Sequence, residues 1–238
     1  MYDVINNNYQ RLSDDIYAIS YIIPRGDSLY LVAVPRGGYC VLNLFIYDKV
    51  NGALENISSD PNFTIQKAYY DPRTDQLLVS GYDFIEDSKR RDEQSEENHT
   101  PCKNDIYLVE DGKFTYLFST SEHEMGKIVM HNDEVIYSIN EIENPYQTDL
   151  TNYAGFSYNL FNKTHSLAKL PSFASDLSMR KIVYHSGDNF YYIGSNERCV
   201  AKLVYVSLKT NKEKVIYEIG LGLQSTISSV HMVSYDHQ

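Results

Sequence analysis

The chain has 238 residues, of which 42% are hydrophobic and 22% are charged, and its formal net charge is −11. This balance is typical of a globular domain and excludes a disordered chain. The negative charge argues against a nucleic-acid backbone or an anionic membrane surface as the main partner. The 22 tyrosines, 9 phenylalanines and absence of tryptophan favour strands, because tyrosine suits half-buried pleated surfaces.

The sequence contains few signals that fix its compartment. No apolar run approaches the roughly 18 residues of a membrane span, and Met1 is followed by polar residues. We expect no membrane insertion; a cytoplasmic protein is favoured, with a trimmed exported protein as the alternative. Cys40, Cys102 and Cys199 lack the spacing of a metal knuckle or a disulfide framework. We therefore expect no metal, no other cofactor and a reducing compartment.

In chain order, the first element is the segment 2–13, YDVINNNYQRLS, which aligns with SYNLFNKTHSLAKL from Ser157 and predicts the outer half of a four-stranded unit. Four similar hairpins follow, each with an apolar strand, a turn that contains aspartate and a second apolar strand. They start at Ser20 (SYIIPRGDSLYLV), Lys67 (KAYYDPRTDQLLV), Lys127 (KIVMHNDEVIYSI) and Lys181 (KIVYHSGDNFYYI). This recurrence indicates an internal repeat of stacked units.

The turn aspartates of these hairpins are in phase. They are Asp27, Asp75, Asp133 and Asp188. Phased carboxylates are compatible with a repeated metal or catalytic site, but aspartate also hydrogen-bonds its own turn backbone and is common in hairpin loops. The closely alternating aspartates of a calcium loop are missing from the sequence. We interpret the four residues as turn residues.

A second hairpin follows each of the first ones. These second hairpins start at Asn43 (NLFIYDKVNGALENIS), Asn104 (NDIYLVEDGKFTYLFS), Gly155 (GFSYNLFNKTHSLAKL) and Ala201 (AKLVYVSLKTNKEKVIYEI). The turns contain asparagine or glycine, which tolerate a positive φ. Each unit thus predicts a four-stranded antiparallel sheet, and radially stacked sheets of this kind make a β-propeller.

These units resemble the repeats of the kelch, TolB-like and YVTN-type propeller families. YVSLKTNKEKVIYEIG from Tyr205 looks like the third strand, turn and fourth strand of such a blade, whereas the Gly-Gly pair of kelch repeats is missing. The resemblance implies an all-β fold of four-stranded antiparallel blades, and a fragment of a larger propeller is the alternative. We expect one β-propeller domain over residues 1–238, with blades at about 15–58, 64–121, 124–171 and 178–220, and a fifth closed by residues 2–13 and 226–236.

Binding is expected on the loops between the second and third strands, since insertions on a scaffold commonly carry it. In the second unit this loop runs from about Phe84 to Lys103 and reads FIEDSKRRDEQSEENHTPCK, with mixed charge and almost no apolar content. We expect it to form either a recognition surface or a solvated irregular insertion. In the third unit the long loop starts at Glu141. The candidate binding residues are Asp87, Lys89, Arg90, Arg91, Tyr146, Tyr153 and Arg198.

Signatures of common enzymes are missing from the sequence, including a Gly-rich phosphate loop, Gly-x-Ser-x-Gly and His-Glu-x-x-His. We therefore expect no catalytic residues, and a binding or scaffold module that recognises a protein or peptide. The alternative is a glycan-binding or glycan-processing propeller, in which paired acids around the ring centre would serve hydrolysis. The partner's identity and the oligomeric state stay open.

Overall fold

The computed structural model describes residues 2–3, 8–9, 13–38, 40–94, 100–122, 125–131, 133–140, 153–167, 178–186, 189–195, 201–207, 209–210 and 212–219. Its contacts divide the chain into two compact units, Met1–His123 (unit 1) and Glu124–Gln238 (unit 2). Each unit is described by itself. The single domain expected over the whole chain stays a prediction.

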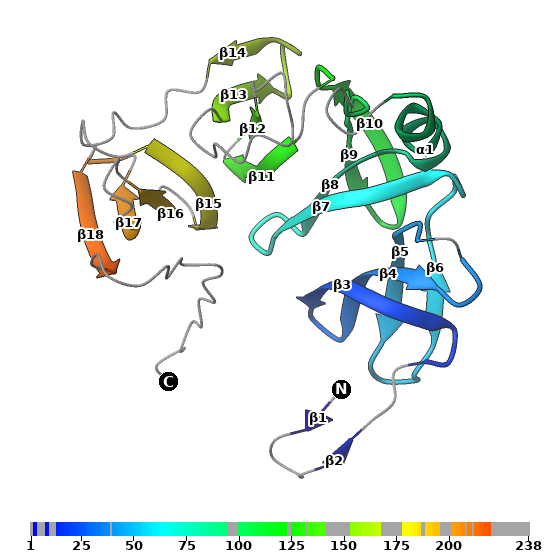
Figure 1. Ribbon diagram of the computed structural model, residues 1–238. Coiled ribbons are helices and arrows are strands. Elements are labelled where there is room, and N and C mark those ends of the chain that lie inside the picture. Colours follow the sequence, from blue (N-terminus) through cyan, green and yellow to red (C-terminus); the bar gives the residue numbers. More distant parts are fainter. Residues whose placement is uncertain are drawn as a thin grey trace. The chain divides into compact units, whose positions relative to one another are not determined.

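Unit 1 contains two four-stranded antiparallel sheets whose strands are neighbours in chain order (Figure 1). The first consists of β3 (Ile16–Arg25), β4 (Ser28–Pro35), β5 (Asn43–Asp48) and β6 (Leu54–Asn56). The second consists of β7 (Phe63–Asp71), β8 (Gln76–Asp83), β9 (Asp105–Glu110) and β10 (Lys113–Ser119). A short pair, β1 (Tyr2–Asp3) and β2 (Asn8–Tyr9), precedes them. The closing blade stays a prediction, since residues 226–236 lie outside the described residues.

The core of unit 1 follows from the alternation of side chains along its strands, which point to opposite faces of a sheet in turn. In β4, Tyr30 and Val32 join a buried cluster with residues of the second sheet, including Ile65 and Leu77. Leu31 of β4 belongs instead to a separate buried cluster on the first sheet. Both faces of this sheet are therefore apolar.

Unit 2 repeats the same sheet twice. Its first sheet consists of β11 (Met125–His131), β12 (Glu134–Asn140), β13 (Tyr153–Asn159) and β14 (His165–Leu167). Its second consists of β15 (Ser178–Ser186), β16 (Asn189–Ser195), β17 (Ala201–Ser207) and β18 (Lys212–Ile219). All neighbouring strands in both sheets are antiparallel. The prediction of four-stranded antiparallel sheets is confirmed.

The hairpin turns use the backbone conformations that their residues predict. Asp111 and Gly112 both have a positive φ, 47° and 73°, in the two-residue turn between β9 and β10. Such turns match the twist of the strands that they join. Asp75, in the turn between β7 and β8, also has a positive φ of 55°, a conformation that aspartate tolerates better than most residues.

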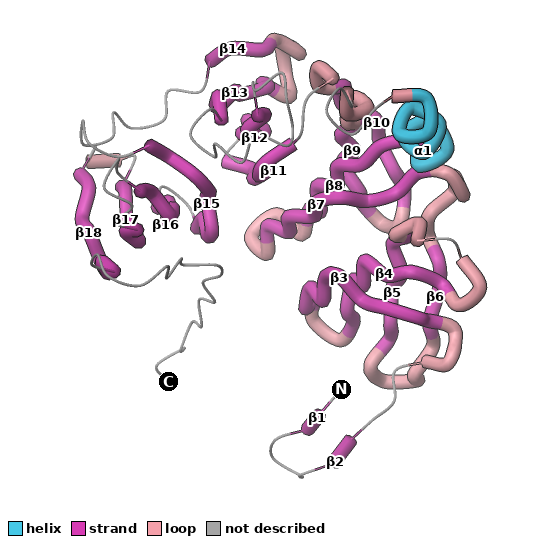
Figure 2. The backbone as a smooth tube through the Cα atoms, viewed as in Figure 1, coloured by secondary structure: helices cyan, strands magenta, loops and turns pink. Residues whose placement is uncertain are grey.

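The insertion of the second sheet is partly helical, which differs from the solvated irregular insertion that was one of our two expectations. Residues Phe84–Glu93 form an α-helix, α1, directly after β8 (Figure 2). The low apolar content that predicted a solvated loop is compatible with a helix here, because capping and charge pairs stabilise it locally. No helix in the described part of the chain is long and apolar enough to span a membrane.

Candidate functional site

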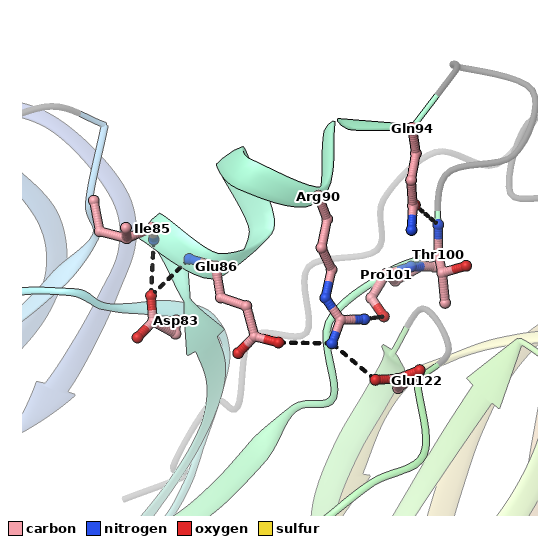
Figure 3. Close-up of polar contacts among 8 residues, drawn as sticks. All are labelled: Asp83, Ile85, Glu86, Arg90, Gln94, Thr100, Pro101 and Glu122. Carbon is pink, nitrogen blue, oxygen red and sulfur yellow. Dashed lines mark hydrogen bonds and ion pairs between the residues drawn. The ribbon is translucent and has the colours of Figure 1, made fainter. Parts of the chain in front are cut away.

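The start of α1 is fixed by Asp83, the last residue of β8. Its Oδ1 accepts hydrogen bonds from the backbone N–H groups of Ile85 at 2.8 Å and Glu86 at 2.9 Å (Figure 3). These bonds satisfy two of the amide groups that a helix leaves unpaired at its first turn. Strand β8 therefore passes directly into the helix, and the sheet fixes where α1 begins.

Charge pairs one turn apart run along α1. Glu86 with Arg90, Asp87 with Arg91 and Lys89 with Glu93 are all four residues apart. Acids lie in the first turn and Arg90 and Arg91 in the last, which is the favourable arrangement for the helix dipole. The cap, the charge pairs and the helix dipole thus stabilise this ten-residue helix locally, although it has no apolar stripe.

Arg90 connects α1 with the end of the second sheet. Its Nη2 donates to Glu86 Oε1 at 2.6 Å and to Glu122 Oε1 at 2.8 Å, and its Nη1 donates to the carbonyl of Pro101 at 3.5 Å (Figure 3). These hydrogen bonds, to Glu122 first and Glu86 second, raise the pKa of the guanidinium. One side chain therefore joins the helix, the segment that leads to β9 and the segment that follows β10.

The inner side of α1 is polar. Asp87 is its buried residue, and its Oδ2 accepts a hydrogen bond from Arg91 Nε at 2.7 Å. Burial, and next the negative charge of Asp87, raise the pKa of the Tyr82 phenol in the neighbouring strand β8. The buried residue of this helix is thus an acid paired within the helix, where most surface helices bury apolar side chains.

Cys102 is buried beside this helix. Burial is the main cause that raises the pKa of its thiol to about 11; the positive charge of Arg90 opposes the shift, and the acids Glu86, Asp87 and Asp83 add to it. Cys102 is therefore protonated at neutral pH.

The outer side of α1 is exposed to solvent. Ile85 is 58% exposed. Gln94, just after the helix, holds the returning chain, because its Oε1 accepts a hydrogen bond from the backbone N–H of Thr100 at 2.7 Å (Figure 3). We call the exposed residues of the helix the α1 surface: Ile85, Glu86, Lys89, Arg91, Asp92 and Glu93.

A second polar cluster lies at the hairpin turns of unit 1. Arg25, at the end of β3, donates to both carboxylate oxygens of Asp75 at 2.7 and 2.6 Å, and Tyr70 donates to the same carboxylate at 2.8 Å. These bonds, from Arg25 first, lower the pKa of Asp75 to about 2. The turn aspartate Asp75 thus joins two sheets, a structural role beyond the local turn that we expected.

The predicted site residues fall into three groups. Asp87, Lys89, Arg90 and Arg91 all lie on α1, although Asp87 is buried and Arg90 is half-buried. Tyr153 begins β13, where it pairs with Asn140 through the backbone. Tyr146 and Arg198 lie outside the described residues, as do Asp188 and residues 141–152. Sequence reasoning missed Glu122 and Asp83, which hold the helix at its two ends.

The polar residues of the described ranges form no group of three or more His, Cys, Asp or Glu side chains that could hold a metal ion. Glu122, part of the Glu122-His123-Glu124 sequence, has its carboxylate paired with Arg90.

Comparison with known proteins identifies no family. No family model matches the chain, and no curated protein matches it. Several solved structures are similar to this chain in fold. An oligogalacturonate lyase in complex with manganese has a TM-score of 0.56 at 11% identity, over 84% of this chain and 53% of its own. TolB from Acinetobacter baumannii has a TM-score of 0.53 at 10% identity, over 87% of this chain and 44% of its own. A Mycobacterium tuberculosis puromycin-hydrolyzing peptidase has a TM-score of 0.53 at 11% identity, over 87% of this chain and 29% of its own.

The fold class follows from these similarities and from the sheets. The neighbours are propeller proteins, and the chain is an all-β, propeller-type protein made of four-stranded antiparallel sheets. The chain spans about half or less of the length of these proteins. At such low identity the likeness shows the fold alone, because propeller-type folds carry many unrelated functions. The number of blades and the kelch-like subfamily stay predictions.

Proposed function

We propose that the protein is a non-catalytic binding or scaffold module, and that it recognises a protein or peptide through the α1 surface. The observation that carries this proposal is that α1 is ordered although no apolar side chain of the helix is fully buried and only Phe84 is half-buried. A helix of this kind adds little to the stability of the sheet, because most helical stability in proteins comes from a packed apolar face. Its side chains are instead presented to solvent by a sheet that fixes their position.

The charge of unit 1 supports a positively charged partner. Unit 1 holds 20 acidic and 11 basic residues, a net charge of −9, whereas unit 2 holds 12 and 10, a net charge of −2. Most of the negative charge of the chain therefore belongs to the unit that carries α1. A peptide rich in lysine or arginine would be steered toward this unit, most strongly at low salt.

A defined peptide library tests the proposal without knowledge of the natural partner. A phage-displayed library of random dodecapeptides is panned against the intact protein at low salt. Binding of the selected peptides is then compared between two triple variants that make the same chemical changes at different places. The test variant, on α1, is Ile85→Ser, Asp92→Asn and Glu93→Gln; the control, elsewhere in unit 1, is Val50→Ser, Asp27→Asn and Glu55→Gln.

All changed residues are exposed, so both variants should fold. We expect the library to yield peptides with net positive charge whose binding is lost in the α1 variant and kept in the control. Equal binding to both variants would contradict a site on α1. A library that yields no binders would contradict peptide recognition, and a glycan array becomes the test of the alternative function.

A further inference from the structure

The contacts of α1 differ in kind from those that hold the sheets together. Leu77, Leu78 and Val79 of β8 are fully buried, whereas α1, which follows the same strand, buries only the carboxylate of Asp87. Described contacts from α1 to other segments include Arg90 to Glu122, Arg90 to the Pro101 carbonyl, and the Phe84 N–H to the Asn62 carbonyl at 2.8 Å. The helix is therefore attached mainly by polar contacts.

Attachment of this kind has a known consequence for local stability. Exposed ion pairs contribute little and are weakened by salt. An isolated helix shorter than about 12 residues is marginal in water. Elements with few buried apolar contacts open locally, with much less free energy than global unfolding requires. The ten residues of α1 meet all three conditions.

Cys102 is placed to respond to such an opening. Cys102 is buried, with only 3% of its surface exposed. Pro101, the residue before Cys102, accepts a hydrogen bond from Arg90 of α1 through its carbonyl, and the charges that shift the pKa of the Cys102 thiol include those of Arg90, Glu86 and Asp87 of α1 and of its capping residue Asp83. A thiol that becomes exposed loses the desolvation that raises its pKa, so both its accessibility and its thiolate fraction rise.

We propose that α1 covers the Cys102 thiol, that α1 detaches locally from unit 1 while the sheets stay folded, that the Arg90–Glu122 contact controls this step, and that detachment makes Cys102 reactive. The structure thereby couples the chemistry of a buried thiol to the position of a surface helix. Since α1 also forms the proposed binding surface, modification of Cys102 would compete with partner binding. That last consequence rests on the proposed function, whereas detachment itself is measured on the free protein.

The test uses a background in which Cys40→Ser and Cys199→Ser leave Cys102 as the only thiol. The full-length protein is treated with 5,5′-dithiobis(2-nitrobenzoic acid) at pH 8. The Cys102 thiolate attacks the disulfide of the reagent, forms a mixed disulfide, and releases one nitrothiobenzoate anion, whose absorbance gives the rate. The rate is compared with that of global unfolding, extrapolated from denaturant. Arg90→Ala removes the contact, Glu122→Gln removes the charge of its acceptor, and Lys89→Ala is the matched control on the exposed side of α1.

We expect Cys102 to react at least tenfold faster than the protein unfolds globally, and faster still at 1 M salt. Arg90→Ala should raise the rate about tenfold and Glu122→Gln about threefold, with the circular dichroism of the sheets unchanged, whereas Lys89→Ala should change it less than twofold. If Arg90→Ala unfolds the protein, Glu122→Gln decides, because it keeps the shape of its side chain. Reaction of Cys102 only at the rate of global unfolding, or equal rates in all variants, would overturn the proposal.

Discussion

Arg25 and Asp75 form a bidentate ion pair between two sheets of unit 1, with Nε and Nη2 donating to the two carboxylate oxygens at 2.7 and 2.6 Å. Arg25 ends the first strand of one sheet, and Asp75 lies in the turn that follows the first strand of the next. The arginine also lies over the ring of Tyr30, 5.3 Å from its centroid. The pair therefore ties two blades together at their turns.

The first prediction concerns this pair. Because Asp75 has a folded-state pKa of about 2, below its ordinary value of 3.8, its contribution is present above pH 4 and lost as the pH falls toward 2. The carboxylate is 53% exposed, so we expect Asp75→Asn to lower the free energy of unfolding at pH 7 by only about 1 kcal/mol. Asparagine also tolerates the positive φ.

Urea denaturation at pH 7 and pH 2.5 checks this expectation. The difference between wild type and Asp75→Asn should shrink at the lower pH. Asp111→Asn is the control, since Asp111 also has a positive φ but is 95% exposed and lies 4.0 Å from Arg25. A loss in the control as large as in Asp75→Asn would contradict a specific role for the pair.

The second prediction concerns the cap of α1. Asp83→Ala removes the acceptor of the Ile85 and Glu86 amide groups and should destabilise the helix by about 1 kcal/mol. Hydrogen exchange of the α1 amides should accelerate roughly fivefold, while exchange in β8 stays unchanged. Asp92→Ala, on the exposed side of the same helix, should have little effect. Uniform acceleration throughout unit 1 would show that the cap stabilises the sheet as well.

The third prediction concerns two adjacent residues of β8. A Cβ at Gly81 would lie 2.0 Å from the Thr64 carbonyl oxygen, a backbone atom that cannot move aside without disrupting the pairing of β7 and β8. We expect Gly81→Ala to cost about 3 kcal/mol or more, or to prevent folding. Ser80, one residue earlier, has a buried Oγ without a hydrogen-bond partner within the described residues.

Ser80→Ala should therefore leave stability unchanged or raise it by up to about 1 kcal/mol, because an unsatisfied buried hydroxyl is removed. Thermal unfolding of both variants, which differ from wild type by small groups at neighbouring positions, checks the contrast. A strong loss in Ser80→Ala would mean that its hydroxyl has a partner, such as an ordered water.

The fourth prediction concerns the core between the two sheets of unit 1. Leu77 is fully buried among residues of both sheets, so Leu77→Ala should cost about 2–5 kcal/mol in urea denaturation. Val50→Ala, at a side chain that is 81% exposed, should stay within about 0.5 kcal/mol of wild type. Similar losses in both variants would contradict the packing of the two sheets.

The strands were predictable from the sequence because their signals are local. Alternating apolar residues and turn residues such as Asp111 and Gly112 suffice to place a hairpin. The helix α1 was also within reach, since Asp83 followed three residues later by Glu86 is a capping-box pattern before the charge pairs begin. The low apolar content of the same segment favours a solvated loop instead, so the two signals in the sequence point to different structures.

The contacts that position α1 could not be predicted in the same way. Arg90 and Glu122 are 32 residues apart, and Arg25 and Asp75 are 50 apart. Their approach depends on the register of several strand pairs, and a one-residue shift in one strand would move a side chain to the other face. The sequence identified Arg90 as a candidate by its charged surroundings, whereas its partner became visible only in the fold.

The central claim, that the α1 surface binds a positively charged peptide, is tested most directly by the affinity of one peptide selected by panning. Its fluorescein-labelled form is titrated with the protein, and the dissociation constant is read from fluorescence anisotropy. We predict that the affinity falls about tenfold in the triple variant Ile85→Ser, Asp92→Asn and Glu93→Gln. It should fall less than twofold in the triple variant Val50→Ser, Asp27→Asn and Glu55→Gln. Equal affinities for the two triple variants would contradict it.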